Sequence, residues 1–460
     1  MTYDFLPSLR DALPTDAHAE VRLQENHSCR VTFLGGNLVG NAMQTVRGVS
    51  ARVCQKGVYG FSSAADCSAE AAKKVLTAAD ENAHFLAARS GRDVPAIPAA
   101  SRGEFAQESP VFPEQKLFSE FAKAIDGYVS EKYPNLSSRA VIATSDCMEK
   151  ALLTNDGASG HIAAPRAYVY VFLNSETKDG QAIELFRAFG GKGTFDRNFD
   201  DPAALYAGID ELYEHLMKKR EGVYAEAGVK TVILGGMLTG MLAHEAVGHT
   251  VEADLVIGGS VAAHSLHKRV GSDLVNMTDF AHHYKDELCP LPVYLDDEGI
   301  LAEDAPIIEN GILTGYLNNR ETAEKFGMTP TGNARAWSFS DEPLIRMRNT
   351  AVLPGKDKLE DMIASVEDGY YLLNTNNGQA DTTGEFMFGV TGGYEIKHGK
   401  LGRAILDTTI SGVAFDMLQT VDMVGDTMTW ASSGFCGKKQ PMPVGMGGPA
   451  VRCKVMVGGR

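Results

Sequence analysis

The stretch at residues 19–64, "AEVRLQENHSCRVTFLGGNLVGNAMQTVRGVSARVCQKGVYGFSSA", decides the fold class of the N-terminal part of the chain. Apolar and polar residues alternate along it with a period of two, and glycine-containing turns interrupt the alternation. This period indicates β-strands, because successive side chains of a strand point to opposite faces of a sheet. The stretch therefore predicts an antiparallel sheet joined by short turns.

Helical patterns follow this predicted sheet. Residues 68–90 place alanine and leucine at helical spacing behind Ser68, a residue suited to cap a helix. Residues 91–113 are rich in proline and small residues and predict a connecting loop. A second round is predicted as a helix at 114–133, strands at 139–146, 150–156 and 166–174, and a helix at 202–220. The two rounds are compatible with an internal α+β duplication.

A length of 460 residues exceeds what a single core usually serves, so we expect two domains. The boundary is placed within "EGVYAEAG" (221–228), which gives an N-terminal α+β domain over 1–225 and a second domain over 226–460. The sequence of the second domain predicts many short strands, for example at 291–300, and one or two functional helices. It is predicted to be mostly antiparallel β, because long helices do not alternate with its strands.

Composition limits the partners and the compartment. Lysine and arginine total 43 against 59 acidic residues, and the net charge of −16 disfavours direct nucleic-acid binding. The most apolar stretch, residues 231–243, is too short to cross a membrane, and the N-terminus lacks the pattern of a signal peptide. The seven cysteines never form a C-x-x-C pair, which favours free thiols in a reducing environment. These features predict a soluble, cytoplasmic protein.

The segment "MLAHEAVGHTVEAD" (241–254) carries the spacing H-E-x-x-x-H. In a regular α-helix, residues five apart point about 140° away from each other, so His244 and His249 would diverge. A π-bulge, with i→i+5 hydrogen bonding, would align them, and Gly248 is where the backbone deviates most easily. Glu245 would then lie beside a shared metal and activate a bound water. The spacing is equally compatible with two histidines that cap or pack near a helix end.

A catalytic zinc site needs a third protein ligand, which leaves one position for water. Cys436 is the candidate, because it lies between Gly434 and Gly437, and two lysines follow that favour its thiolate. Glu252 and Asp254, which follow the motif, could be outer partners of the ligands, a ligand or a solvated helix end. His264, His267, His282 and His283 stand in polar surroundings that favour surface positions over metal binding.

Several long stretches resemble the TldD/PmbA family, also called the modulator-of-gyrase family, and in particular its catalytic TldD branch. They are "HEAVGHTVEADLV" (244–256), "LDDEGI" (295–300), "IIENGILTGYLNNRETAEKFGMTPTGNARAW" (307–337), "PLIRMRNTAVLPG" (343–355) and "CGKKQPMPVGMGGPAVRCKVMVGG" (436–459). The resemblance implies a zinc peptidase with Zn2+ held by His244, His249 and Cys436, and Glu245 as the catalytic glutamate. It also implies a homodimer, or a heterodimer with a homologous PmbA/TldE-like subunit, whose N-terminal domains form a substrate cavity.

The leading hypothesis is a zinc-dependent peptidase that hydrolyses short or unfolded peptides by a metal-bound water, with Glu245 as general base. The alternative is a non-catalytic peptide-binding or regulatory subunit of a TldD/PmbA-type complex. A metal-dependent hydrolase of another bond stays open, because the motif does not define the bond that is cleaved. The oxyanion could be stabilised by zinc itself or by His264, His267 or Tyr394.

Overall fold

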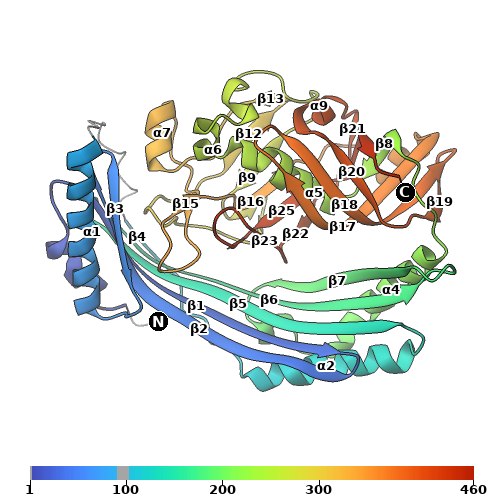
Figure 1. Cartoon of the computed structure of the whole chain (residues 1–460), viewed down its shortest axis with the longest axis horizontal. Helices are drawn as coiled ribbons and strands as arrows, with labels where there is room; N and C mark the ends of the chain where they lie inside the picture. The colour runs from blue at the N-terminus through green and yellow to red at the C-terminus, as the bar shows by residue number, and fades with distance from the viewer. Residues whose placement is uncertain (1–2, 91–102, 460) are drawn as a thin grey trace.

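A computed structural model describes residues 3–90 and 103–459, and its mixture of helices and strands confirms the predicted α+β class. Figure 1 shows two parts, a long curved sheet and a second part of shorter strands that lies over the concave side of the sheet. Across the described residues, each helix is too short or too polar to span a bilayer.

The N-terminal part is built on one seven-stranded sheet in the order β3-β2-β1-β5-β6-β4, with β7 also paired to β6. Its strands are β1 (His18–Leu34), β2 (Asn37–Gln55), β3 (Val58–Ala64), β4 (Gly103–Ala106), β5 (Ser138–Thr154), β6 (Ala158–Glu176) and β7 (Ala182–Lys192). A three-stranded meander followed by a helix occurs twice, as β1–β3 with α1 (Ala69–Ser90) and as β5–β7 with α4 (Tyr206–Arg220). The two meanders meet where β1 pairs antiparallel with β5.

Three expectations about individual elements were wrong. The strands expected at 139–146 and 150–156 are one strand, β5, which ends at Thr154, because its pairing with β1 runs through residues 147–149 without a shift of register. Strand β4 lies inside the predicted loop of residues 91–113, of which residues 91–102 fall outside the described part. Residues 291–300 make only an isolated bridge, Leu295 to Leu301, because the acidic side chains there bind the backbone.

The period of two along the N-terminal strands separates an apolar face from a polar face. On β1, Val21 and Val31 belong to buried clusters with the helices α1 and α2 (Gln115–Lys132), and α4 shares the second cluster. The alternate residues Glu20 and Arg22 are also buried, but they face the C-terminal part: Arg22 donates to the carbonyl of Ser338 at 3.1 Å. The polar face of this sheet is therefore an internal interface rather than a solvated surface.

Two larger sheets and three two-stranded ones make up the described C-terminal part. Strands β8 (Gly228–Leu234), β17 (Asp368–Ala380), β18 (Glu385–Lys397), β20 (Thr408–Val413) and β26 (Val451–Val457) close into a ring, because β17 pairs with both β8 and β18, and β19 (Lys400–Ala404) and β21 (Met423–Val424) extend it. The second sheet contains β9 (Met277–Phe280), β12 (Ala305–Glu309), β13 (Ile312–Leu313), β16 (Asn349–Val352), β22 (Thr429–Ala431) and β25 (Gly445–Gly448). The short helices of this part are α5 (Gly236–Met241), α6 (Ala253–Ile257), α7 (Arg320–Phe326), α8 (Leu359–Ala364) and α9 (Ala414–Gln419), whereas α3 (Phe195–Asn198) follows β7 in the N-terminal part.

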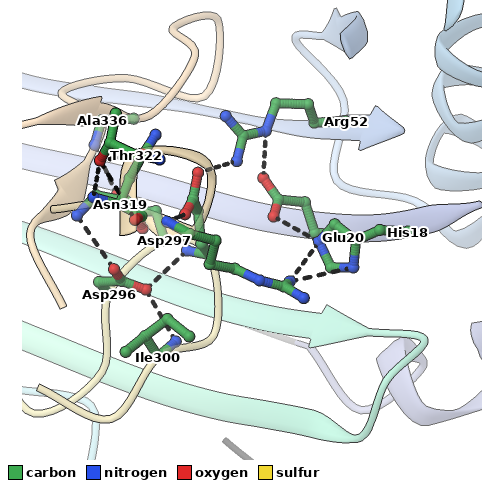
Figure 2. A network of polar contacts seen from close by, with 12 residues as sticks. His18, Glu20, Arg52, Asp296, Asp297, Ile300, Asn319, Thr322 and Ala336 are labelled. Atoms are coloured by element: carbon green, nitrogen blue, oxygen red, sulfur yellow. Dashed lines mark hydrogen bonds and ion pairs between the residues drawn. The ribbon is translucent and has the colours of Figure 1, made fainter. Parts of the chain in front are cut away.

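A buried ion-pair network joins the two parts (Figure 2). Arg52 of β2 donates to Glu20 of β1 at 2.7 Å and to Glu298 of the C-terminal part at 2.5 Å. All three side chains are at most 5% exposed. Burial alone would raise the pKa of Glu20, but Arg52 and His18 hold it below the ordinary value. The "DDEG" turn (residues 296–299) thus supplies the C-terminal side of this interface. Removing one partner would leave the other buried charge without compensation.

A second buried cation lies in the same interface. Lys150 of β5 donates to Asp297 at 2.5 Å and to the carbonyl of Ala336 at 2.8 Å. Burial lowers the pKa of Lys150 to about 8, and Asp297 offsets only part of that shift. Together the Arg52 and Lys150 contacts fix the C-terminal part on the polar face of the sheet.

Candidate metal centre

The H-E-x-x-x-H segment follows β8 and α5 and forms a π-helix over Leu242–Gly248. The N–H of His249 donates to the carbonyl of His244, five residues earlier, so the segment has the i→i+5 bonding that aligns the two histidines. Gly248 permits this geometry. A Cβ at that position would lie 2.1 Å from Sδ of Met347 and 3.0 Å from the carbonyl oxygen of Ala243. Any larger residue at position 248 would therefore collide with its surroundings.

The π-turn brings the two imidazoles to the same side of the helix, with ring centroids 5.1 Å apart. Cys436, on the short strand β23 (Phe435–Cys436), places its Sγ 3.3 Å from Nε2 of His249. The candidate ligand atoms of His244, His249 and Cys436 all lie within 4.8 Å of one another. Within the described ranges, this is the one group of three or more histidine, cysteine or acidic residues with such spacing. The other histidines weighed from the sequence do not join it.

The donor set fits a zinc ion. His244 is 1% exposed, and neither of its ring nitrogens has a hydrogen-bond partner among the described residues. Buried polar atoms are normally paired, so two unpaired nitrogens in one ring indicate a missing ligand. Two imidazoles and one thiolate are typical zinc donors and leave one coordination position open.

The electrostatics of Cys436 differ from those of every other cysteine in the chain. Burial raises its pKa, but the neighbouring His244 and His249 rings outweigh burial and lower the pKa to about 3. Burial raises the pKa of the remaining six thiols, namely Cys29, Cys54, Cys67, Cys147, Cys289 and Cys453. All seven cysteines are free. Cys436 is therefore the single thiol that the protein prepares as a thiolate ligand.

A buried carboxylate lies behind His249. Glu252 is fully buried, and its Oε2 accepts a hydrogen bond from Nδ1 of His249 at 2.7 Å. Lys438, two residues beyond Cys436, places Nζ 3.3 Å from Glu252 and 2.7 Å from Asp254. Burial lowers the pKa of His249, but Glu252 and Cys436 outweigh it and raise the pKa to about 10. Of the two acids weighed from the sequence, Glu252 thus contacts a candidate ligand directly, whereas Asp254 contacts only Lys438.

Glu245 lies between the two imidazoles. Its carboxylate oxygens are 3.9 Å from Nε2 of His244 and 3.7 Å from Nε2 of His249. The side chain is 23% exposed and faces a groove, so it can meet a molecule that enters from solvent. This position, beside the ligand atoms and open to the groove, suits a proton acceptor.

The groove has a volume of about 1310 Å³. It is lined by Glu245, His249, Leu255, Gly378, Gln379, Ala380, Asp381, Thr382, Glu385, Phe386, Met387, Ser411, Gly412, Val413, Phe435, Gly437 and Lys438. Strands β17, β18 and β20 supply one wall, and the residues around the ligands supply the other. His264, His267 and Tyr394, the oxyanion candidates from the sequence, are not among the lining residues, and Tyr394 borders a separate cavity beside His215.

Sequence reasoning missed the residues that support the segment around Cys436. Arg346 is fully buried and donates to the carbonyls of Cys436 and Gln440, both at 2.8 Å. Arg166 and Tyr168, on the N-terminal sheet, donate to Ser432. Two arginines in the otherwise largely apolar segment "IRMRN" (345–349) are a weak indication that Arg346 has a structural role. No sequence pattern relates the residues of β6 to Cys436.

The sequence matches the PmbA/TldA metallopeptidase C-terminal domain over residues 227–459 and the PmbA/TldA metallopeptidase domain 1 over residues 19–83. A metalloprotease of Methanothermobacter thermautotrophicus is 33% identical over 380 residues, which cover 81% of this chain and 77% of the relative. A zinc metalloprotease TldD homolog of Saccharolobus solfataricus is 35% identical over 255 residues, which cover 55% of this chain and 56% of the relative. A metalloprotease of Methanocaldococcus jannaschii is 28% identical and covers 97% of this chain and 98% of its own length.

Solved structures share the fold over the whole chain. TldE from Thermococcus kodakarensis superposes with a TM-score of 0.75 at 15% identity, covering 98% of this chain and 99% of its own. A protein from Thermotoga maritima, described as a candidate modulator of a DNA gyrase, gives a TM-score of 0.77 at 18% identity, covering 98% of this chain and 97% of its own. At such identities these structures support the fold alone.

Proposed function

Because this chain belongs to the PmbA/TldD family of metallopeptidases, we propose that it is a zinc-dependent peptidase with His244, His249 and Cys436 as the metal ligands. The observation that carries this proposal is the convergence of three ligand atoms, one nitrogen each from His244 and His249 and the sulfur of Cys436, within 4.8 Å of one another. When bound, zinc supplies a Lewis acid that polarises a carbonyl group and lowers the pKa of water at the site.

Glu245 is the proposed general base. Its carboxylate accepts the proton of the attacking water at the mouth of the groove and returns it to the leaving amine of the cleaved peptide bond. The distances of 3.7 and 3.9 Å to the two imidazoles support this role, because they leave Glu245 close to the ligand atoms without making it a ligand. Glu252 keeps His249 oriented so that Nε2 faces Cys436.

The proposed substrates are short or unfolded peptides that lie extended along the groove. Three of the lining residues are Gly378, Gly412 and Gly437, where the absence of side chains lets another backbone approach closely. The groove volume of about 1310 Å³ exceeds the roughly 300–1,000 Å³ of typical small-molecule pockets, which favours a larger, chain-like substrate.

Metal content tests the proposal most directly. We expect about one zinc per wild-type chain and loss of that zinc in His244→Ala and in Cys436→Ala, because each variant removes one of only three protein ligands. Wild-type protein should also cleave an unfolded test protein into fragments that mass spectrometry identifies. A wild-type chain that takes up no zinc after supplementation would instead support the non-catalytic peptide-binding subunit.

We further propose that the chain acts as a dimer, with itself or with a homologous TldE-like subunit. β2 pairs with β1 along its length, but β3 covers its other edge only over residues 49–55. The uncovered stretch exposes Leu38, Val39 and Met43, which are 48%, 58% and 64% exposed. An open strand edge with exposed apolar residues is suited to pair with another chain. Light scattering should therefore report a dimer in solution that Val39→Glu weakens.

A further inference from the structure

The loop that carries Cys436 lies against the N-terminal sheet. This segment, residues 432–437, is called the Cys436 loop below. Arg166, Tyr168 and Tyr170 occupy alternate positions on β6, so their side chains share one face of the sheet. The residues between them, such as Val169, belong to the opposite, helix-covered face. Three consecutive positions of the polar face of β6 are therefore directed at this loop.

Each of these three side chains donates to the backbone of the loop. Arg166 Nη1 lies 3.0 Å from the carbonyl oxygen of Ser432, and the hydroxyl of Tyr168 lies 2.8 Å from the same oxygen. The hydroxyl of Tyr170 lies 2.8 Å from the carbonyl oxygen of Ser433. Backbone contacts of this kind fix the course of the loop whatever its side chains are.

Two of the three residues, Arg166 and Tyr168, are buried in the interface. Arg166 is 1% exposed, and its Nε and Nη2 donate to Oδ1 of Asp146 at 3.0 and 2.9 Å. Its guanidinium also lies 4.8 Å from the ring centroid of Phe435, the residue before Cys436. Tyr168 is 3% exposed. The support is thus a fixed part of the sheet rather than a set of mobile surface side chains.

We propose that Arg166, Tyr168 and Tyr170, named the β6 platform here, are positioning residues that hold Cys436 at the metal centre. This inference rests on the proposed zinc peptidase. The Cys436 loop has glycine on both sides of the Phe435–Cys436 pair, at Gly434 and Gly437, and would otherwise lose conformational freedom when the thiolate binds the metal. The platform orders the loop in advance, so zinc affinity depends on the docking of the two parts of the chain.

The test is the double variant Tyr168→Phe/Tyr170→Phe in the full chain, which removes two hydroxyls and leaves both rings. The matched control is Tyr128→Phe/Tyr133→Phe, because these hydroxyls donate to Asp210 and both rings pack against the cluster on the opposite, helix-covered face of the sheet. Zinc dissociation constants are measured by competition with a chromophoric chelator. Cobalt is then substituted for zinc, and the thiolate-to-cobalt charge-transfer band reports the Cys436 bond.

Outer partners of metal ligands change affinity by about 10- to 100-fold, and we expect about 10-fold weaker zinc binding with a weaker charge-transfer band in the platform variant. The control should bind zinc as the wild type does, with a similar loss of thermal stability. Wild-type affinity and an unchanged cobalt spectrum in the platform variant would overturn the inference while leaving the peptidase proposal intact. Failure of the wild type to bind zinc would overturn both.

Discussion

Glu252 accepts a hydrogen bond from Nδ1 of His249 at 2.7 Å, and this contact leaves Nε2 of the ring directed at Cys436. A carboxylate behind a histidine ligand fixes the tautomer and makes the ring a better donor. Glu252→Gln should therefore weaken zinc binding by about 10- to 100-fold. Asp254→Asn is the control, because Asp254 shares the contact with Lys438 but not the contact with His249. Equal zinc affinities of the two variants in chelator competition would contradict this role of Glu252.

Substitution of Glu245 should impair catalysis without impairing metal binding. Glu245→Gln keeps the size and polarity of the side chain but cannot accept the proton, so we expect peptide cleavage to fall by about 100- to 10,000-fold. Zinc content should stay at the wild-type level. Glu385→Gln, at an exposed glutamate on another wall of the groove, should have a far smaller effect on the rate. Cleavage at the wild-type rate by zinc-loaded Glu245→Gln would rule out the proposed base.

Gly248 should not tolerate a side chain. A Cβ there would overlap Met347 Sδ at 2.1 Å, and Met347 is 1% exposed and has little room to move. Overpacking of this kind costs about 1–3 kcal/mol, and the strain would fall on the turn between the two histidines. We expect Gly248→Ala to lower the melting temperature and to weaken zinc binding.

The control for that substitution is Gly127→Ala within α2, where a Cβ would meet no atom within 4 Å. Alanine is the better helix former, so this change should leave stability equal or higher. If both glycine variants keep wild-type zinc affinity, then the π-turn does not depend on Gly248.

Arg52 should be important for stability rather than for chemistry. Arg52→Met leaves the carboxylates of Glu20 and Glu298 buried without their main partner, and breaking a buried pair in this way costs about 3–5 kcal/mol. Lys74→Met breaks a pair whose side chains are 74% and 78% exposed, so the free energy of unfolding should stay close to that of the wild type. Urea unfolding of the two variants checks the contrast. Equal midpoints would show that the interface network is dispensable.

Lys150 should make stability depend on pH in the alkaline range. Burial lowers its pKa from 10.5 to about 8, so between these values the unfolded chain holds a proton that the folded chain has released. The free energy of unfolding therefore rises with pH in this window, by about 1.4 kcal/mol per pH unit, and is unaffected by this group below pH 8. Lys150→Met lacks this contribution. The stability of the wild type relative to Lys150→Met should increase between pH 8 and about pH 10, and a constant difference would contradict the assignment.

The sequence predicted the elements whose signals are local. The helix that starts after Ser68 does so because the Ser68 hydroxyl accepts from the N–H of Ala71 at 3.1 Å, and the strands of the first meander follow their alternation. The break expected within residues 139–156 failed, because the pairing of β5 with β1 continues through Cys147 and Glu149. Both residues are buried, and the charge of Glu149 is paired with His161. The predicted strand at 291–300 failed because buried acids there bind backbone N–H groups.

The candidate ligands were predictable, but their supports were not. His244 and His249 follow from the motif once a π-turn is considered, and Cys436 follows from its glycine and lysine neighbours and from the family resemblance. Arg166 and Tyr168 carry no local signal, because their role depends on which face of β6 meets the Cys436 loop. The cytoplasmic location expected from the free cysteines remains a prediction.

The π-turn also means that the motif holds one residue more than a regular helical turn would need. Residues four apart in an α-helix and residues five apart in a π-turn both lie about one turn from each other. The extra residue is therefore absorbed between His244 and His249, where the N–H of His249 bonds to the carbonyl of His244. The chain beyond the turn keeps its course, so Glu252 still reaches His249 and meets Lys438 from the distant Cys436 segment. The length of the motif and the position of the third ligand are thus separate features of the chain.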